Sequence, residues 1–198
     1  MEQIRSFIAI ELPTELKQEL TRLESQLKAG NQPWVKWVKP DSIHLTLKFL
    51  GNIDTDTTAA ITRAIEESAR GIEPFRLEVR ELGVFPNLKQ VRVAWVGISG
   101  QVDKLSLLQK RLESQLTPLG FTAESRPFTP HLTLARLSER ASPDERQDFG
   151  RLIASTNFEA GDIEVREISL MKSQLTRAGA IYSRISQVEL EREQSLKS

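Results

Sequence analysis

The sequence predicts an α+β fold of two pseudo-symmetric lobes, each an antiparallel sheet with helices packed outside, and an active cleft between the lobes. The first observation is a set of segments that recur in the same order at nearly one spacing. They are Arg-Leu-Glu-Ser-Gln-Leu at 22–27 and 111–116, His-Leu-Thr-Leu at 44–47 and 131–134, and Glu-Val-Arg-Glu at 78–81 and 164–167, displaced by 89, 87 and 86 residues. The second observation is a series of short alternating segments, several of them adjacent in the sequence, which is typical of antiparallel strands. Two related lobes leave a cleft between them, where ligand sites commonly lie.

The repeat also defines the expected domain organisation. It is far longer than the roughly 20–50 residues of a solenoid unit, and it occurs only twice, which favours a pair of lobes over a stacked array. We therefore expect a single bilobal domain over residues 1–198, with internal repeats at about 1–90 and 91–187 and a charged tail at 188–198.

Each half is expected to contain the same kinds of element in a similar order. Alternating polar and apolar residues predict the strands, and longer windows, such as the one that Pro13 opens, predict the helices. The first half is expected to run through a strand at 5–10, a helix at 13–28, strands at 34–38 and 43–50, a helix at 57–70 and a strand at 75–80. The second half is expected to run through a strand at 91–98, a helix at 102–116, a strand at 130–137, a helix at 143–154 and strands at 163–171 and 181–185.

Composition limits the class of protein and its compartment. Of 198 residues, 39% are hydrophobic and 27% are charged, as in a soluble globular protein, and the 27 basic and 27 acidic side chains cancel. Any site for a polyanion must therefore be local. The absence of cysteine excludes disulfides, thiolate nucleophiles and Cys-based zinc sites, and is the usage expected in a reducing compartment. We expect a cytoplasmic protein that neither carries an export signal nor enters a membrane.

The two histidines are the most informative residues in the chain. Both stand first in His-Leu-Thr-Leu, one in each half, and the chain has no other histidine. Because side chains alternate between the faces of a strand, His44 and Thr46 share one face, and His131 and Thr133 share another. Two lobes related by a pseudo-twofold axis could bring these faces together in a symmetric site of four side chains.

Such a site is suited to acid/base catalysis on a phosphate ester. The unperturbed pKa of imidazole lies near neutrality, so one histidine can accept a proton while the other donates one. In the opening of a cyclic phosphate, one histidine would deprotonate water and the other would protonate the departing ribose oxygen on the opposite side of phosphorus. The threonine hydroxyls could donate hydrogen bonds to the non-bridging oxygens.

Other interpretations of these residues have less support. A single strand histidine is more often structural, but a structural role does not explain why histidine occurs only in the two motifs. A zinc or iron site would need carboxylates to complete its ligands, and neither motif offers one at a neighbouring position on the same face. A serine nucleophile lacks the Gly-x-Ser-x-Gly turn.

The flanks of the motifs resemble a known family. The segments RSFIAIELP (5–13), WVKPDSIHLTLKFLG (37–51) and RPFTPHLTLAR (126–136) are similar to the RNA 2′,3′-cyclic phosphodiesterases of the two-histidine (HxTx) phosphoesterase superfamily, historically called 2′-5′ RNA ligases. The resemblance spans nearly the whole chain. It implies a duplicated bilobal α+β fold with a central cleft, neither metal nor cofactor, and hydrolysis of an RNA 2′,3′-cyclic phosphate end to a 2′-phosphate.

The resemblance also implies roles for individual residues. His44 would donate the proton to the 3′ leaving oxygen and His131 would accept one from water, although a near-symmetric site also permits the reverse assignment. Thr46 and Thr133 would bind the phosphate. The second motif of the family extends to an arginine, matched here by Arg136, which could bind the phosphate with its guanidinium.

Strand alternation bears on the positions beyond each motif. It places Arg136 on the face opposite His131 unless the strand bulges. The equivalent residue of the first half is Phe49, which could stack on a base or belong to the core. The same alternation places Lys48 on the His44 face.

Several aromatic and basic residues could border the site. Trp34, Lys36, Trp37 and Lys39 precede the first motif and could stack on bases and contact phosphates, but half-buried structural tryptophans are the favoured interpretation. The sequence does not place Lys89, Arg92 or Arg126, which could also contribute.

Three alternatives to RNA end hydrolysis stay open at this point. They are ligation through a 2′-5′ bond, hydrolysis of another cyclic phosphate such as that of a nucleoside or of ADP-ribose, and a binding module without turnover. The expected partners are RNA 3′ ends carrying a cyclic phosphate or small cyclic nucleotides, and the protein is expected to be a monomer.

Overall fold

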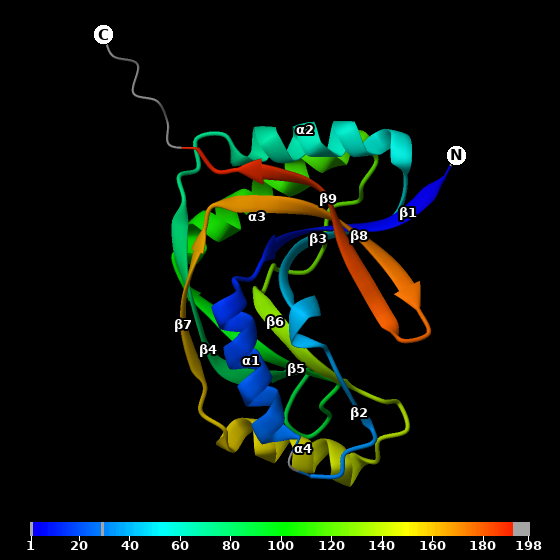
Figure 1. Cartoon of the computed structure of the whole chain (residues 1–198), viewed down its shortest axis with the longest axis vertical. Coiled ribbons are helices and arrows are strands. Elements are labelled where there is room, and N and C mark those ends of the chain that lie inside the picture. Colours follow the sequence, from blue (N-terminus) through cyan, green and yellow to red (C-terminus); the bar gives the residue numbers. More distant parts are fainter. Residues whose placement is uncertain (1, 29, 192–198) are drawn as a thin grey trace.

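Two antiparallel sheets form the framework of the protein (Figure 1). The computed structural model describes residues 2–28 and 30–191. The strands are β1 (Gln3–Glu11), β2 (Val35–Trp37), β3 (His44–Asp54), β4 (Phe75–Phe85), β5 (Val93–Gly100), β6 (His131–Leu137), β7 (Glu159–Val165), β8 (Glu167–Thr176) and β9 (Gly179–Glu189). The helices are α1 (Thr14–Leu27), α2 (Thr58–Ala69), α3 (Val102–Leu116) and α4 (Pro143–Ser155), with short 3₁₀ turns η1 (Pro40–Ser42), η2 (Thr55–Thr57) and η3 (Thr117–Leu119). The α+β class and the antiparallel sheets predicted from the sequence are confirmed.

The two sheets share one strand order. The four-stranded sheet runs β3-β1-β8-β9, and the five-stranded sheet runs β6-β5-β4-β7 with β2 added beside β6. In the four-stranded sheet, the motif strand β3 pairs with β1 of its own half, and β1 pairs with β8 of the other half. In the five-stranded sheet, β6 likewise pairs with β5 of its own half, and β5 pairs with β4 of the other half. The lobes consequently do not coincide with the sequence halves, because β4 and β8 have changed places between them.

One predicted strand is wrong, because residues 163–171 form parts of two strands in different sheets. Ile163 of β7 pairs with Leu77 of β4, whereas Leu170 of β8 pairs with Ile8 of β1. Arg166 lies between the strands, and its carbonyl oxygen accepts a 2.7 Å hydrogen bond from the Leu190 amide. The side chains that belong to the main hydrophobic core change from odd positions, Ile163 and Val165, to even positions, Ile168 and Leu170, so the alternation shifts phase where the chain crosses from one sheet to the other.

The start of the predicted charged tail also needs correction. Residues 188 and 189 belong to β9, and Val188 and Leu190 are buried in the core. Apolar side chains at alternating positions explain this extension of the strand. Residues 192–198 of that tail lie outside the described residues.

Helices cover the face of each sheet that lies opposite the motif histidines. Apolar residues three or four positions apart give each helix one buried side, as in α3, where Leu105, Leu108, Leu112 and Leu116 are buried. Helix α3 contacts β3, and α4 contacts β4. In Figure 1, α2 and α3 lie at one end of the molecule and α4 lies at the other. Within the described ranges, none of the helices is long and apolar enough to cross a membrane.

A buried ion pair ties β3 to α3. The ammonium of Lys48 lies 2.8 Å from Glu113 Oε2 and donates a 2.7 Å hydrogen bond to the carbonyl oxygen of Thr122. The Lys48 and Glu113 side chains are only 8% and 16% exposed. Glu113 also accepts hydrogen bonds from Gln109 and from the Glu124 amide. The network therefore links the first motif strand to the segment that leads to the second.

We expect Lys48→Met to lower the free energy of unfolding by about 3–5 kcal/mol, because it leaves the Glu113 carboxylate buried without its charge partner. Urea denaturation would measure the change. The double variant Lys48→Met/Glu113→Gln, which removes the isolated charge, should recover much of the loss. Arg151→Ala is the control, since it breaks an ion pair of α4 whose members are 69% and 67% exposed, and should change stability by less than about 1 kcal/mol. Equal effects of Lys48→Met and Arg151→Ala would contradict the role of the buried pair.

Candidate functional site

A β-bulge in β3 determines which side chains accompany His44. Directly opposed residues of an antiparallel pair share a face of the sheet. On β1, Phe7, Ala9 and Glu11 alternate onto one face, and their partners on β3 are Phe49, Thr46 and His44. One extra residue therefore separates Thr46 from Phe49. His44 and Thr46 share a face as expected, and they share it with Phe49.

The same bulge reverses the predicted position of Lys48. Simple alternation places Lys48 on the His44 face, but it pairs with Ile8 on the opposite, helix-covered side, where it meets Glu113. The extra residue in the strand is the physical reason for this correction.

An equivalent bulge occurs in β6. On β5, Gly97, Trp95 and Val93 alternate onto one face, and their partners on β6 are His131, Thr133 and Arg136. The bulge thus places Arg136 on the face of His131 and Thr133, whereas regular strand alternation would place it on the opposite face. From histidine to leucine, β3 and β6 have the same sequence of partly buried, buried and exposed positions. Phe49 and Arg136 are the exposed residues at the equivalent position of each strand.

The two motif strands meet where the sheets join. β3 contacts β6, although they belong to different sheets, and both lie in the middle of the molecule (Figure 1). The Val38 amide, which follows β2, donates a 2.8 Å hydrogen bond to the Leu134 carbonyl of β6. The connection from β2 to the first motif is therefore attached to the second motif strand.

Aromatic rings surround His44. Phe7 stacks on its imidazole with a centroid distance of 4.5 Å, and Tyr182 approaches edge-on at 5.0 Å. Burial is the largest influence on the imidazole and lowers the pKa of His44 to about 4. A backbone hydrogen bond with Ser42 and the charge of Glu11 oppose this pKa shift. His44 is therefore neutral at pH 7 in the unliganded protein.

Glu11 is held in its ionised form beside His44. It accepts hydrogen bonds from Arg184 Nε at 2.8 Å and from the Ser169 hydroxyl at 2.6 Å. Burial raises the pKa of Glu11, but these hydrogen bonds more than offset burial, so the net shift is downward. Since Glu11 pairs directly with His44 across β1 and β3, it supplies a fixed negative charge next to the imidazole.

His131 has a defined ring orientation. Its Nδ1 lies 2.7 Å from the Thr129 carbonyl oxygen, which can only accept a hydrogen bond, so Nδ1 carries a proton and Nε2 is left as the acceptor of the neutral ring. Phe85 packs edge-on against the imidazole at 5.2 Å. Each histidine thus engages the backbone two residues before it and contacts at least one aromatic ring.

Several of these contacts were not anticipated from the sequence. Phe7 and Glu11 lie four residues apart along a recognisable strand, so their shared face was available as a signal. Tyr182, Phe85 and Arg184 come from strands whose pairing with the motifs depends on the whole topology, and the sequence carried no local signal for them.

The residues that precede the first motif divide between core and surface. Trp34 and Trp37 each pack edge-on against Phe149 of α4 at 5.9 Å, which confirms their structural role. Lys36 is exposed and pairs with Arg136 across β2 and β6, so it lies on the His131 face. Lys39 is also exposed.

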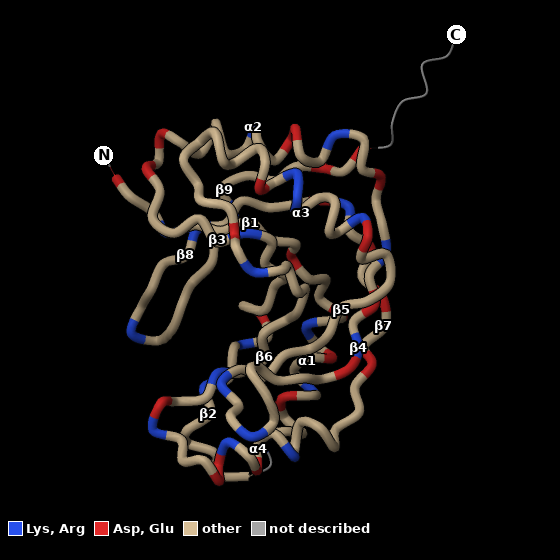
Figure 2. The backbone as a smooth tube through the Cα atoms, turned by 180° about the vertical axis from the view of Figure 1, so that it is seen from behind, with Lys and Arg blue, Asp and Glu red and all other residues tan. Residues whose placement is uncertain are grey.

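A basic cavity adjoins Arg136. It has a volume of about 720 Å³ and is lined by Arg136, Lys89, Arg92 and Arg146 together with Glu139 and four further residues. Figure 2 shows basic positions gathered beside β2 and β6. The guanidinium of Arg146 is occupied with the carbonyl oxygens of Ala141, Val91 and Ser138. The structure thus brings Lys89 and Arg92 to Arg136, whereas Arg126 is exposed in the segment before β6.

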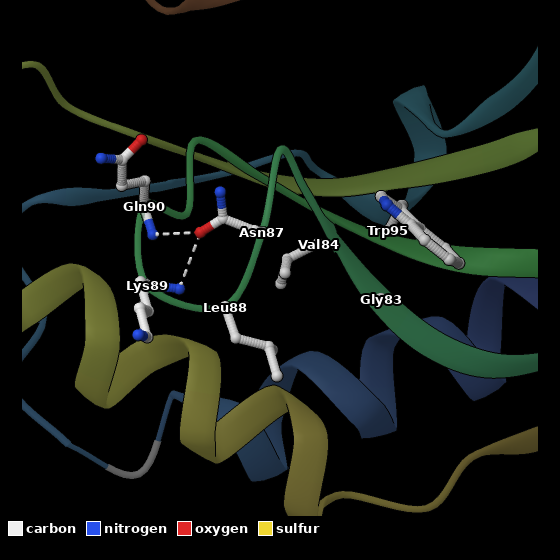
Figure 3. Close-up of a pocket in the computed structure, with 7 residues that line it drawn as sticks. All are labelled: Gly83, Val84, Asn87, Leu88, Lys89, Gln90 and Trp95. Carbon is white, nitrogen blue, oxygen red and sulfur yellow. Dashed lines mark hydrogen bonds between the residues drawn. The ribbon is translucent and has the colours of Figure 1, made fainter.

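A separate cavity of about 730 Å³ lies under the β4–β5 connection (Figure 3). Asn87 shapes this connection by accepting hydrogen bonds from the amides of Lys89 and Gln90, both at 3.0 Å. The Trp95 indole covers Gly83, where a Cβ atom would come within 2.2 Å of the ring. Among the described residues, no group of three or more His, Asp or Glu side chains is arranged to hold a metal ion.

Comparison with known proteins gives concordant results. Residues 10–177 match the family model described as the 2′-5′ RNA ligase superfamily. A protein named RNA 2′,3′-cyclic phosphodiesterase from Methanothermobacter thermautotrophicus is 36% identical over 182 residues, which cover 91% of this chain and 96% of that protein. The fold is similar to TT0787 of Thermus thermophilus, with a TM-score of 0.78 and 26% identity over 96% of this chain and 100% of that chain. It is also similar to E. coli LigT complexed with 3′-AMP, with a TM-score of 0.76 and 26% identity over 96% and 99%.

We expect the imidazole of His44 to titrate with a midpoint near pH 4 in the unliganded protein, as followed by NMR of its ring protons. Because the unfolded chain binds a proton near pH 6.5 and the folded chain only near pH 4, the free energy of unfolding should fall as the pH drops through this window. Inorganic phosphate should raise the midpoint, since an adjacent anion favours the charged imidazole. His44→Asn provides the resonance assignment and should remove this part of the pH dependence of stability. A His44 midpoint at 6.5 in the absence of phosphate would contradict the burial of the ring.

Proposed function

This chain belongs to the 2′-5′ RNA ligase superfamily, and we propose that it is a hydrolase that opens RNA 2′,3′-cyclic phosphates with His44 and His131 as its acid/base pair. The observation that carries the proposal is the duplicated, bulged motif strand, which in each lobe presents on one face a histidine, a threonine and the exposed residue five positions after the histidine. Relatives named RNA 2′,3′-cyclic phosphodiesterase cover nearly the whole chain and support the same activity.

The proposed reaction is an in-line displacement at phosphorus. One histidine removes a proton from water, whose oxygen forms a bond to phosphorus while the bond to the ribose O3′ breaks. The other histidine gives a proton to O3′, and the product carries a 2′-phosphate. We assign the donor role to His44 and the acceptor role to His131. The free Nε2 of a neutral His131, with its proton held on Nδ1 by Thr129, suits the acceptor role.

The proton of His44 has to arrive with the substrate. Its pKa of about 4 leaves the imidazole neutral at pH 7 in the unliganded protein. A bound phosphate anion and the ionised Glu11 both favour the protonated ring, so binding of the substrate would raise the pKa of His44. His44 would then be charged only when a leaving group is in place.

The remaining motif residues would bind the phosphate. We propose that the hydroxyls of Thr46 and Thr133 donate hydrogen bonds to the non-bridging oxygens as negative charge increases there. Arg136 would add a charged donor from one lobe alone. The mechanism uses only these side chains, and no step in it requires a metal ion or a cofactor.

We expect the protein to convert an RNA oligomer with a 2′,3′-cyclic phosphate end to a 2′-phosphate in excess EDTA, as measured by chromatography with a 3′-phosphate standard. His44→Ala and His131→Ala should each lower kcat by at least about 100-fold, because each removes one member of the acid/base pair. Circular dichroism would establish that the variants are folded. Loss of activity in EDTA, or retention of it in either variant, would argue against the paired mechanism.

We expect Arg136→Ala to lower kcat/KM by about 10- to 100-fold, since a charge-assisted hydrogen bond to phosphate is lost, and Arg136→Lys to recover only part of this. Steady-state kinetics at two ionic strengths would separate the contact from general attraction of the anion. Arg126→Ala is the matched control, because Arg126 is exposed near the same strand but precedes it. Equal effects of Arg136→Ala and Arg126→Ala would indicate that Arg136 acts only through general electrostatic attraction of the anionic substrate.

A further inference from the structure

The residues that oppose the two histidines across their sheets differ in charge. Glu11 of β1 pairs with His44 of β3, whereas the residue of β5 that pairs with His131 of β6 is Gly97. We propose that Glu11 is a positioning residue that selects His44, of the two histidines, as the proton donor to the leaving oxygen. This inference deepens the proposed function and rests on it.

Two hydrogen bonds fix the carboxylate of Glu11 on the histidine face. Its donors are Arg184 and Ser169, which come from β9 and β8. Ser169 pairs with Ala9, so it shares a face with Glu11. Directly opposed residues of an antiparallel pair have Cβ atoms about 4.5–5.5 Å apart, a separation at which a carboxylate favours a protonated neighbour. The carboxylate therefore acts on the imidazole of His44 from a defined position.

The groups that face His44 come from three elements. Burial lowers the pKa of the imidazole to about 4, the charge of Glu11 on β1 opposes this shift, and the charge of Lys17 on α1 adds to it. Tyr182 of β9 meets the ring edge-on. Arg184, also on β9, reaches His44 through its ion pair with Glu11. Of the charges that act on the imidazole, Glu11 thus favours its protonated form and Lys17 its neutral form.

The backbone beside Gly97 leaves no room for an acidic side chain. A Cβ atom at this position would lie 2.8 Å from the carbonyl oxygen of Arg80 and 3.5 Å from the Trp95 ring. The first distance is shorter than Cβ atoms adopt, so a carboxylate opposite His131 would require β4 to move. The second lobe consequently lacks, at this position, the charge that favours a proton donor, and its histidine is left as the acceptor.

The difference between Glu11 and Gly97 gives direction to a nearly symmetric site. In the substrate complex, only molecules with a protonated His44 and a neutral His131 can take a proton from water and give one to O3′. A negative charge beside His44 raises the fraction of complexes in that state. The pH dependence of the rate in the complex reports its essential acid in the alkaline limb and its essential base in the acid limb. Glu11 should therefore influence the alkaline limb alone.

The test measures the single-turnover rate against pH, with a saturating RNA oligomer that ends in a 2′,3′-cyclic phosphate. Glu11→Gln keeps the size of the side chain and removes its charge, so the pKa of His44 should fall, and the alkaline limb should move about 1 pH unit lower. The acid limb should stay in place. Glu11→Asp, which retains a carboxylate, should restore at least part of the shift. Arg184→Gln removes the positive charge beside Glu11 and should move the alkaline limb to higher pH.

Glu167→Gln is the matched control. It also removes one negative charge, but Glu167 acts on Arg184 and is not among the charges that act on His44, so neither limb should move. Circular dichroism would establish that all variants are folded. An unmoved alkaline limb in Glu11→Gln, a loss of rate that is equal at every pH, or the same shift in Glu167→Gln would each overturn the proposal.

A second measurement separates this inference from the proposed function. If the wild-type protein opens no cyclic phosphate, the proposed function fails, and NMR titration of the His44 ring protons in saturating inorganic phosphate then decides on Glu11. Glu11→Gln should lower the His44 midpoint by about 1 pH unit relative to the wild type. An unchanged midpoint would reject the role of Glu11.

Discussion

The alternation of side chains along a β-strand would place the residue five positions after each motif histidine on the opposite face, and a single extra residue in the strand returns it to the histidine face. Because the bulge occurs in both β3 and β6, each lobe presents three side chains on one face instead of two. The same bulge turns Lys48 toward α3, where its ammonium joins a buried carboxylate. The bulge in β3 thus determines both which side chains accompany His44 and how β3 is attached to α3.

A duplicated site would treat its substrate symmetrically, but a phosphodiester is not symmetric. Two differences between the lobes would provide direction here. His44 is enclosed by Phe7 and Tyr182 with Glu11 opposite, whereas His131 rests on the Thr129 carbonyl and Phe85. Phe49 is replaced by Arg136 at the equivalent exposed position. Each lobe therefore retains the same arrangement of histidine and threonine and differs in the groups that surround it.

Local patterns in the sequence predicted most of the fold and the face that each histidine shares with its threonine. The helices, nearly all strands and the four His and Thr residues follow from periodicity and repetition within short windows. The bulges could not be predicted, because an extra residue is defined only against a partner strand, and so Lys48 was placed on the wrong face. The division of residues 163–171 between two strands could not be predicted for a similar reason. A shift in the alternation of core residues indicates that the chain crosses between sheets only once both sheets are known. Tyr182 and Phe85 reach the histidines through pairings between distant strands.

The exchange of β4 and β8 between the lobes has a consequence for the origin of the fold. A chain of one repeat could supply only part of either sheet, because β4 near the end of the first half lies in the five-stranded sheet and β8 near the end of the second half lies in the four-stranded sheet. A half-length ancestor would have satisfied its strand edges by pairing with an identical chain and trading the strand near its end, in the manner of a domain-swapped dimer. Fusion of two copies of the gene would have placed the exchanged strands in a single chain. It would also have freed the two copies of each residue to diverge, as Phe49 and Arg136 have done.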